Sequence, residues 1–190
     1  MRTVTVKSGN YQVLIGPGLL KEAGERIART VRGRRCAVVT DDRVGPLYAK
    51  ALVSSLEAAG IRADVLSFPN GEQHKTLETF ARVVAFFAER ELTRADFAVA
   101  LGGGVVGDLT GFAAACYMRG IDCVQVPTTL LAAVDSSVGG KTAVDLPMGK
   151  NLVGAFHQPK LVLCGTDVIA KLPQPLLRDG AAEMIKCGVL

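Results

Sequence analysis

Short apolar runs alternate with longer amphipathic segments along most of the chain. Alternating apolar and polar residues on both sides of Ser8-Gly9-Asn10 predict an amino-terminal β-hairpin. Further along, apolar runs bounded by Gly, Pro or Asp are each followed by a stretch with the helical period. The pattern predicts strands at 35–40, 63–68, 97–101, 122–126 and 161–164, and helices at 19–30, 46–59, 76–90, 107–117 and from 175 onward.

Because strand and helix alternate, we expect an α/β fold with a parallel sheet and helices on both of its faces. Ligands in such folds bind beyond the carboxyl ends of the strands. Polar loops follow the predicted strands at that edge, at 41–42, 70–75, 102–108 and 128–129. Their convergence predicts a ligand site there.

Residues 130–159 are irregular, with polar and glycine-rich stretches between apolar residues. A long segment of this kind inside a compact protein is either functional or disordered, and its apolar content favours function. We predict a Rossmann-like α/β domain over 1–172 and the start of a second, helical domain over 173–190. The last helix stays apolar to its end without a stop residue, so we expect the chain to be truncated.

Composition narrows the class of protein. Hydrophobic residues make up 49% of the 190 residues, which allows a substantial core and argues against disorder. The net charge of +4 is spread along the chain, so small anionic ligands are better candidates than nucleic acid. No signal peptide or membrane-length apolar run is present. The five cysteines lack C-x-x-C spacing, which predicts reduced thiols in a cytoplasmic protein.

The glycine-rich stretch after the third predicted parallel strand is the first candidate for chemistry. Gly102, Gly104 and Gly107 have the G-x-G-x-x-G spacing, which suits either a pyrophosphate loop or a tight turn. The acidic residue expected some twenty positions later would be Asp122, but it begins a strand instead of ending one. Asp41 or Asp42 is better placed for a ribose, so this is not the standard Rossmann order.

Charged residues beside the loops each allow two interpretations. Asp108 either favours the positive end of a helix or belongs to a site where cofactor and substrate meet. Glu72 and Lys75 either decorate a helix start or bind adenosine hydroxyls and phosphate. Lys141 and Lys150 lie in glycine-flanked loops, where phosphate or carboxylate binding explains them better than a solvated helix face does.

Three further charged residues lie outside these loops. Arg119 could cap the end of its helix or reach an anion, and the sequence slightly favours capping. Glu183 and Lys186 lie one helical turn apart, which is typical of a surface ion pair, although Glu183 could also be a metal ligand. With only His74 and His157 in the chain, a metal site cannot be derived from the residues alone.

Several glycine-rich and polar segments occur in a distinctive order, at 69–75, 102–114, 117–120, 127–142, 149–159 and 183–188. Together they resemble the amino-terminal part of the 3-dehydroquinate synthase family. The resemblance implies a carbon–oxygen lyase of the shikimate pathway that converts 3-deoxy-D-arabino-heptulosonate 7-phosphate to 3-dehydroquinate and phosphate. It implies NAD, a divalent metal (zinc or cobalt), and a cytoplasmic homodimer at full length.

The resemblance also implies roles for individual residues. It assigns the NAD site to Asp41, Asn70, Glu72, Lys75, Gly103, Gly104, Val105, Gly107, Asp108, Thr128, Thr129, Lys141 and Lys150. It assigns the substrate and catalytic site to Asp135, Lys141, Asn151 and Lys186, with Arg119 supplied by the neighbouring subunit. Glu183 would be one metal ligand, the others being histidines beyond residue 190.

Other readings remain open. Related sugar phosphate cyclases form valiolone-like or inosose products, and iron-type alcohol dehydrogenases share the fold with a glycine-rich loop. The segments around Lys141 and Lys150 argue against a dehydrogenase. The chain by itself could act only as a nucleotide-binding module, and we expect it to be inactive alone.

Overall fold

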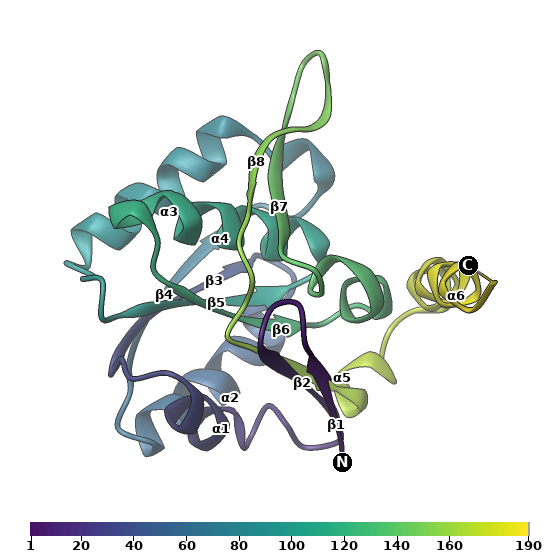
Figure 1. The fold of residues 1–190 in the computed structure, drawn as a ribbon, viewed down its shortest axis with the longest axis horizontal. Helices are drawn as coiled ribbons and strands as arrows, with labels where there is room; N and C mark the ends of the chain where they lie inside the picture. The colour runs from purple at the N-terminus through teal and green to yellow at the C-terminus, as the bar shows by residue number, and fades with distance from the viewer. Residues whose placement is uncertain (190) are drawn as a thin grey trace.

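The computed structural model describes residues 1–189 and places a seven-stranded sheet at the centre (Figure 1). All neighbouring strands are parallel except the first two, which form the predicted antiparallel hairpin. In spatial order the strands are β1 (Arg2–Val6), β2 (Tyr11–Gly16), β9 (Leu161–Gly165), β6 (Asp122–Pro127), β5 (Phe97–Gly102), β3 (Arg35–Asp41) and β4 (Arg62–Phe68). The predicted mostly parallel α/β fold is confirmed.

Helices cover both faces of this sheet. In Figure 1, α1 (Ala23–Thr30) and α2 (Gly45–Ala58) lie below it, and α3 (Leu77–Glu89) and α4 (Gly104–Cys116) lie above. The central strands are therefore buried on both sides, and alternate residues enter separate cores. On β5, Val99 joins the core under α1 and α2, whereas Ala98 and Ala100 join the core under α3 and α4.

Two predicted helices begin at other residues. The helix predicted at 19–30 starts at Ala23, because Gly18 to Glu22 form a turn instead. The helix predicted at 107–117 starts earlier, at Gly104, so the second and third glycines of the loop lie inside the helix. A glycine in a helix permits a close neighbour, and Gly107 and Gly111 of α4 both have one.

The segment 130–159, predicted to be irregular, is ordered. It contains a π-helical turn, η3 (Ala132–Ser136), and an antiparallel hairpin of β7 (Lys141–Leu146) and β8 (Gly149–Phe156). The hairpin lies over α4 on the upper side of the molecule (Figure 1). The strands escaped prediction because their glycines and charged residues, which line a cavity, break the simple apolar–polar alternation.

The carboxyl-terminal part consists of α5 (Thr166–Ile169) and α6 (Gln174–Val189), and α6 projects from the body in Figure 1. It touches the body where Gly180 meets Leu130. The proposed start of a second domain at residue 173 stays a prediction. No helix within residues 1–189 combines the length and apolarity that a membrane crossing requires.

The cysteines are all free. Burial raises the pKa of the Cys36 and Cys123 thiols to about 12 and that of Cys164 to about 11, so these three stay protonated core residues. Cys116 and Cys187 are exposed instead.

Candidate functional site

The glycine loop connects the centre of the sheet to the start of α4. Gly103 precedes the first helical residue, Gly104, and the opening N–H groups of an α-helix have no acceptor within the helix. These groups and the helix dipole together favour an anion at this point. A Cβ on Gly103 would lie 3.4 Å from the nearest heavy atom, Cγ2 of Thr129, which is an ordinary van der Waals contact, so the folded loop has room for a methyl group there.

The strand order places this loop at a switch point of the sheet. From β3 the chain leads through α2, on one face, to β4 at the edge. From β5 it leads through α4, on the other face, to β6 on the opposite side. At such a switch point, here beyond the carboxyl ends of β3 and β5, α/β proteins of this kind bind their ligands.

Asp41, at the end of β3, is buried with both carboxylate oxygens engaged. Its Oδ1 accepts the main-chain N–H groups of Arg43 (2.9 Å) and Val44 (2.8 Å), and its Oδ2 accepts Nδ2 of Asn70 (3.0 Å). The Asn70 N–H in turn donates to Asp42 Oδ1 at 3.0 Å. These contacts give Asp41 and Asn70 a role in holding two loops together at this switch point.

Thr128 and Thr129 follow β6, beside the glycine loop. The Thr128 N–H donates to the Gly102 carbonyl at 2.9 Å, which ties the two loops together. The Thr128 hydroxyl is buried and has no hydrogen-bond partner among the described residues. Thr129 Oγ1 accepts the Ala132 N–H at 3.2 Å. A buried hydroxyl without a partner next to free helix N–H groups suits a bound phosphate group.

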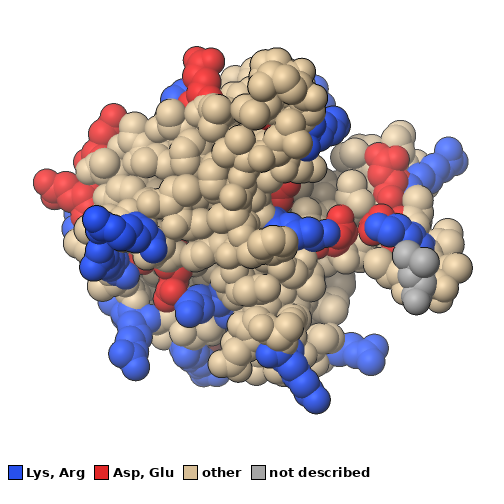
Figure 2. All heavy atoms as spheres, turned by 45° about the horizontal axis from the view of Figure 1, so that its top comes forward, with Lys and Arg blue, Asp and Glu red and all other residues tan. Residues whose placement is uncertain are grey.

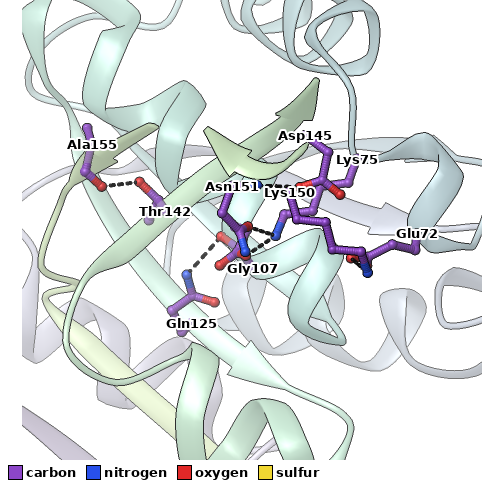
Figure 3. Close-up of polar contacts among 10 residues, drawn as sticks. Glu72, Lys75, Gly107, Gln125, Thr142, Asp145, Lys150, Asn151 and Ala155 are labelled. Atoms are coloured by element: carbon purple, nitrogen blue, oxygen red, sulfur yellow. Dashed lines mark hydrogen bonds and ion pairs between the residues drawn. The ribbon is translucent and has the colours of Figure 1, made fainter. Parts of the chain in front are cut away.

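Three predicted site residues, Lys75, Asp108 and Asn151, are in contact with one another beside α4. The Lys75 ammonium donates to Asp108 Oδ2 at 2.5 Å. It also donates to Asn151 Oδ1 at 2.6 Å (Figure 3). Lys75 follows the 3₁₀ turn η1 (Glu72–His74), Asp108 lies in α4 and Asn151 in β8. The Lys75 and Asp108 side chains are only 6% and 15% exposed, so their ion pair is largely shielded from water.

Burial raises the pKa of the Asp108 carboxyl above its usual value of 3.8. The hydrogen bond and positive charge of Lys75 oppose this effect, and the carboxylates of Glu72 and Asp135 add to it. Asp108 is therefore more than a favourable charge at a helix start, because it lies inside a cluster of titratable groups.

A second, exposed bridge runs parallel to the first. Lys150 Nζ lies 3.0 Å from Glu72 Oε1, and both side chains extend into solvent. The hydrogen bond to Glu72 raises the pKa of Lys150. Figure 3 shows Lys150 and Glu72 pointing toward each other from β8 and η1, beside the Lys75 contacts. One ion pair, Lys150 with Glu72, and one hydrogen bond, from Lys75 to Asn151, thus join the η1 segment to the hairpin.

An open cavity of about 450 Å³ lies between α4, η3 and the hairpin. Four predicted site residues line it: Asp108, Asp135, Lys141 and Asn151. Across the cavity edge, Lys141 Nζ lies 3.5 Å from Asp135 Oδ1. Leu152 and Phe156 of β8 add apolar walls that the sequence did not indicate.

Arg119 lies outside this group. It is exposed after α4, in the turn η2 (Tyr117–Arg119), and within residues 1–189 its side chain makes neither a hydrogen bond nor an ion pair. The helix-capping interpretation therefore has no hydrogen bond to support it in the described part of the chain.

Glu183 and Lys186 also lie away from the main cluster, on α6. They form an ion pair of 2.8 Å, whose hydrogen bond raises the pKa of Lys186. The Asp135 charge contributes to this shift as well. Figure 2 shows acidic and basic side chains gathered at the junction between the body and the projecting lobe at the right. Residues 1–189 contain no group of three or more His, Cys, Asp or Glu side chains placed to hold a metal.

Two polar residues near the site were missed by sequence reasoning. Gln125 is buried in β6 and donates to the Gly107 carbonyl at 3.2 Å, and a lone polar residue in an apolar strand could have revealed it. Asp145 lies at the irregularity in the β7–β8 pairing, between Val144 and Leu146. No sequence pattern indicated Asp145, because its contacts depend on the unrecognised hairpin.

Solved structures place this arrangement in a class of enzymes. A 2-deoxy-scyllo-inosose synthase complexed with carbaglucose-6-phosphate, NAD⁺ and Co²⁺ has a TM-score of 0.90 and 29% identity, over 97% of this chain and 50% of that one. A 2-epi-5-epi-valiolone synthase from Streptomyces hygroscopicus subsp. jinggangensis 5008 with NAD⁺ and Zn²⁺ bound has a TM-score of 0.85 and 32% identity, over 98% and 51%. The fold is that of the sugar phosphate cyclases.

Within this class, the family model for the 3-dehydroquinate synthase N-terminal region matches residues 65–179. The 3-dehydroquinate synthase of Caulobacter vibrioides is 56% identical over the whole chain, and that of Rhizobium johnstonii is 50% identical. The chain belongs to the 3-dehydroquinate synthase family. It spans about half the length of these relatives, 52% and 51% respectively.

Iron-containing alcohol dehydrogenases share the fold at a lower level. One such structure matches 93% of the chain with a TM-score of 0.75 and 18% identity, which shows a common architecture alone.

Proposed function

We propose that this chain is the NAD-binding half of a 3-dehydroquinate synthase that acts on 3-deoxy-D-arabino-heptulosonate 7-phosphate. One observation carries the proposal: Asp108, Asp135, Lys141 and Asn151 line a single cavity beside the start of α4. The family membership and the 56% identity to the Caulobacter vibrioides synthase support it.

The switch point between β3 and β5 has the features that a dinucleotide requires. The glycine at 103, the free N–H groups of α4 and the buried Thr128 hydroxyl suit a pyrophosphate. When bound, NAD supplies a temporary store for the hydride removed from the substrate. Val105, Gly107 and Asp108 of α4, with the pair formed by Glu72 and Lys150, complete the proposed cofactor site.

The cavity under the hairpin has the charges to hold an anionic sugar. The exposed Lys141 ammonium is a compact positive charge suited to carboxylate or phosphate oxygens. Asp135 orients Lys141 and can accept substrate hydroxyl groups. The Asn151 amide, held by Lys75, presents polar atoms to the same space. These side chains bind and orient the substrate, and the walls formed by Leu152 and Phe156 reduce its contact with water.

The metal site does not follow from these residues alone. Glu183 is proposed as one ligand of zinc or cobalt, ions that accompany the two cyclase structures. Its carboxylate is paired with Lys186 here, and the remaining ligands would have to come from outside residues 1–189. Arg119 is proposed to bind the substrate of a second subunit in a cytoplasmic homodimer.

A second candidate is another sugar phosphate cyclase reaction. The TM-score of 0.90 to an inosose synthase favours it on fold. Its sequence identity of 29% is well below the 50% and 56% of the dehydroquinate synthases. The two activities differ in their substrates, so one assay separates them.

The test uses a chimeric synthase in which this chain replaces the matching half of the Caulobacter vibrioides enzyme. With NAD and zinc, it should release phosphate from the heptulosonate phosphate and not from glucose 6-phosphate or sedoheptulose 7-phosphate. The chain alone should bind NAD without releasing phosphate. Phosphate release from glucose 6-phosphate or sedoheptulose 7-phosphate, without release from the heptulosonate phosphate, would contradict the proposal. A chelator should abolish phosphate release, which tests the metal requirement.

A further inference from the structure

Asp145 joins the two segments that carry Lys75 and Asn151. It lies in β7 at the point where the pairing with β8 becomes irregular. Its main-chain N–H donates to the Lys75 carbonyl at 2.8 Å, and its Oδ1 accepts the Asn151 N–H at 2.7 Å (Figure 3). It lines a second open cavity, on the side of η1, but not the cavity that holds Asp135 and Lys141.

The Asn151 backbone needs this support. Its φ angle is +58°, in the left-handed region that is strained for residues with a side chain, although Asn tolerates it better than most. A charge-assisted hydrogen bond from the Asn151 N–H to Asp145 stabilises that conformation. In this conformation the Asn151 side chain places Oδ1 2.6 Å from the Lys75 ammonium.

We infer that Asp145 is a positioning residue that fixes Asn151 at the substrate cavity and, through Asn151, the Lys75 ammonium beside it. It acts through the Asn151 main chain, because its Oδ1 accepts the Asn151 N–H. The inference rests on the proposed synthase function, because the effect of fixing Asn151 is measured as kcat/KM of the synthase. It assigns catalytic importance to a residue whose own side chain lies outside the substrate cavity.

Two substitutions separate the hydrogen bond from the charge. Asp145→Ala removes both, whereas Asp145→Asn removes the charge and keeps an oxygen that can accept the Asn151 N–H. In the chimeric synthase, Asp145→Ala should lower kcat/KM for the heptulosonate phosphate about 10- to 100-fold. The NAD dissociation constant should change by less than about threefold, because the Lys75 main chain stays bound to the Asp145 N–H. Asp145→Asn should recover kcat/KM to within about threefold of the unsubstituted enzyme.

Asp96 provides a matched control at the other end of the sheet. Its Oδ2 accepts the Thr93 N–H at 2.7 Å, just before β5. Asp96 is more deeply buried than Asp145, so Asp96→Ala should destabilise the protein at least as much. It should leave kcat/KM within about twofold if folded, and Asp96→Asn serves the same purpose if the alanine variant does not fold.

Amide hydrogen exchange measures the hydrogen bond from the Asn151 N–H to Asp145 without turnover. It is recorded on this chain by itself, outside the chimeric synthase, and on its Asp145 variants. The Asn151 amide should exchange about tenfold faster in Asp145→Ala and keep its protection in Asp145→Asn. Equal kcat/KM losses in both Asp145 variants, or unchanged Asn151 exchange in Asp145→Ala, would overturn the assignment. Failure of the unsubstituted chimeric synthase to release phosphate would instead count against the proposed function, which keeps the two tests distinct.

Discussion

The two walls of the candidate site are built in different ways. The wall formed by β5 and the start of α4 rests on a strand that is buried at every residue, with apolar side chains packed on both faces. The wall formed by β7 and β8 is a two-stranded hairpin, and every residue of β8 is exposed or half-exposed. An isolated hairpin of this kind is marginally stable, so its position depends on what it touches.

Close packing and polar contacts hold the hairpin in place. A Cβ on Gly111 of α4 would lie 2.4 Å from Thr142 Cγ2, so β7 and α4 approach as closely as a glycine allows. In the hairpin, Asn151 accepts a hydrogen bond from Lys75, and Lys150 donates one to Glu72 of η1. Apolar burial on both faces thus fixes β5. The hairpin is fixed by one buried apolar residue, Val144, together with these close and polar contacts.

The largest expected effect comes from the sheet side of the comparison. Leu101→Ala in β5 should lower the free energy of unfolding by about 2–5 kcal/mol, because a fully buried side chain leaves a cavity. Leu152→Ala on the hairpin should change it by less than about 0.5 kcal/mol, because Leu152 is 59% exposed. Urea unfolding of both variants measures the difference, and equal losses would contradict the distinction between the two walls.

A smaller effect is expected where the hairpin meets α4. Gly111→Ala should destabilise the protein by about 1–3 kcal/mol, because the new methyl group forces β7 away from the helix. Gly188→Ala is the matched helix control, with nothing within 4 Å of its Cβ, and should be neutral or stabilising. Thermal unfolding compares them. A harmless Gly111→Ala would show that the hairpin does not depend on this close approach.

The cluster of Lys75, Asp108 and Asn151 should make the free energy of unfolding depend modestly on pH. Because burial raises the folded-state pKa of Asp108 above 3.8, its contribution to stability is fully present below that value and is lost as the pH rises through the folded pKa. The free energy of unfolding of the unsubstituted chain, minus that of Asp108→Asn, should therefore fall as the pH rises from 3.8. Urea titrations of both proteins at several pH values measure it, and a difference that rises with pH would refute the assignment.

The smallest effect is expected at the exposed bridge. Lys150→Met should leave the urea midpoint unchanged, because Lys150 and Glu72 are 70% and 48% exposed and such pairs contribute little. The same variant should weaken NAD binding if Lys150 belongs to the cofactor site. A shifted midpoint would mean that the surface bridge, and not the Lys75 cluster, holds the hairpin to η1.

Prediction from the sequence succeeded where burial dictates the pattern. The parallel strands are continuous apolar runs, so β3, β5 and β6 were identified within a residue or two, and the polar loops at their ends followed. The hairpin was missed because its polar and glycine positions serve the cavity and α4. The contacts of Lys75 with Asp108 and Asn151 join residues 33 and 76 positions apart, and no local pattern encodes them. The role of Asp145 could not be predicted from the sequence for the same reason.

The most direct test of the central claim is an NAD titration of this chain by calorimetry, comparing it with Gly103→Ala and Gly188→Ala. We expect saturable binding at one site per chain, unchanged in Gly188→Ala. Gly103→Ala should weaken it at least about tenfold, because its methyl group fits the folded loop but occupies the space that a pyrophosphate needs. No saturable binding, or equal affinity in Gly103→Ala, would contradict a cofactor site at the junction of β5 and α4.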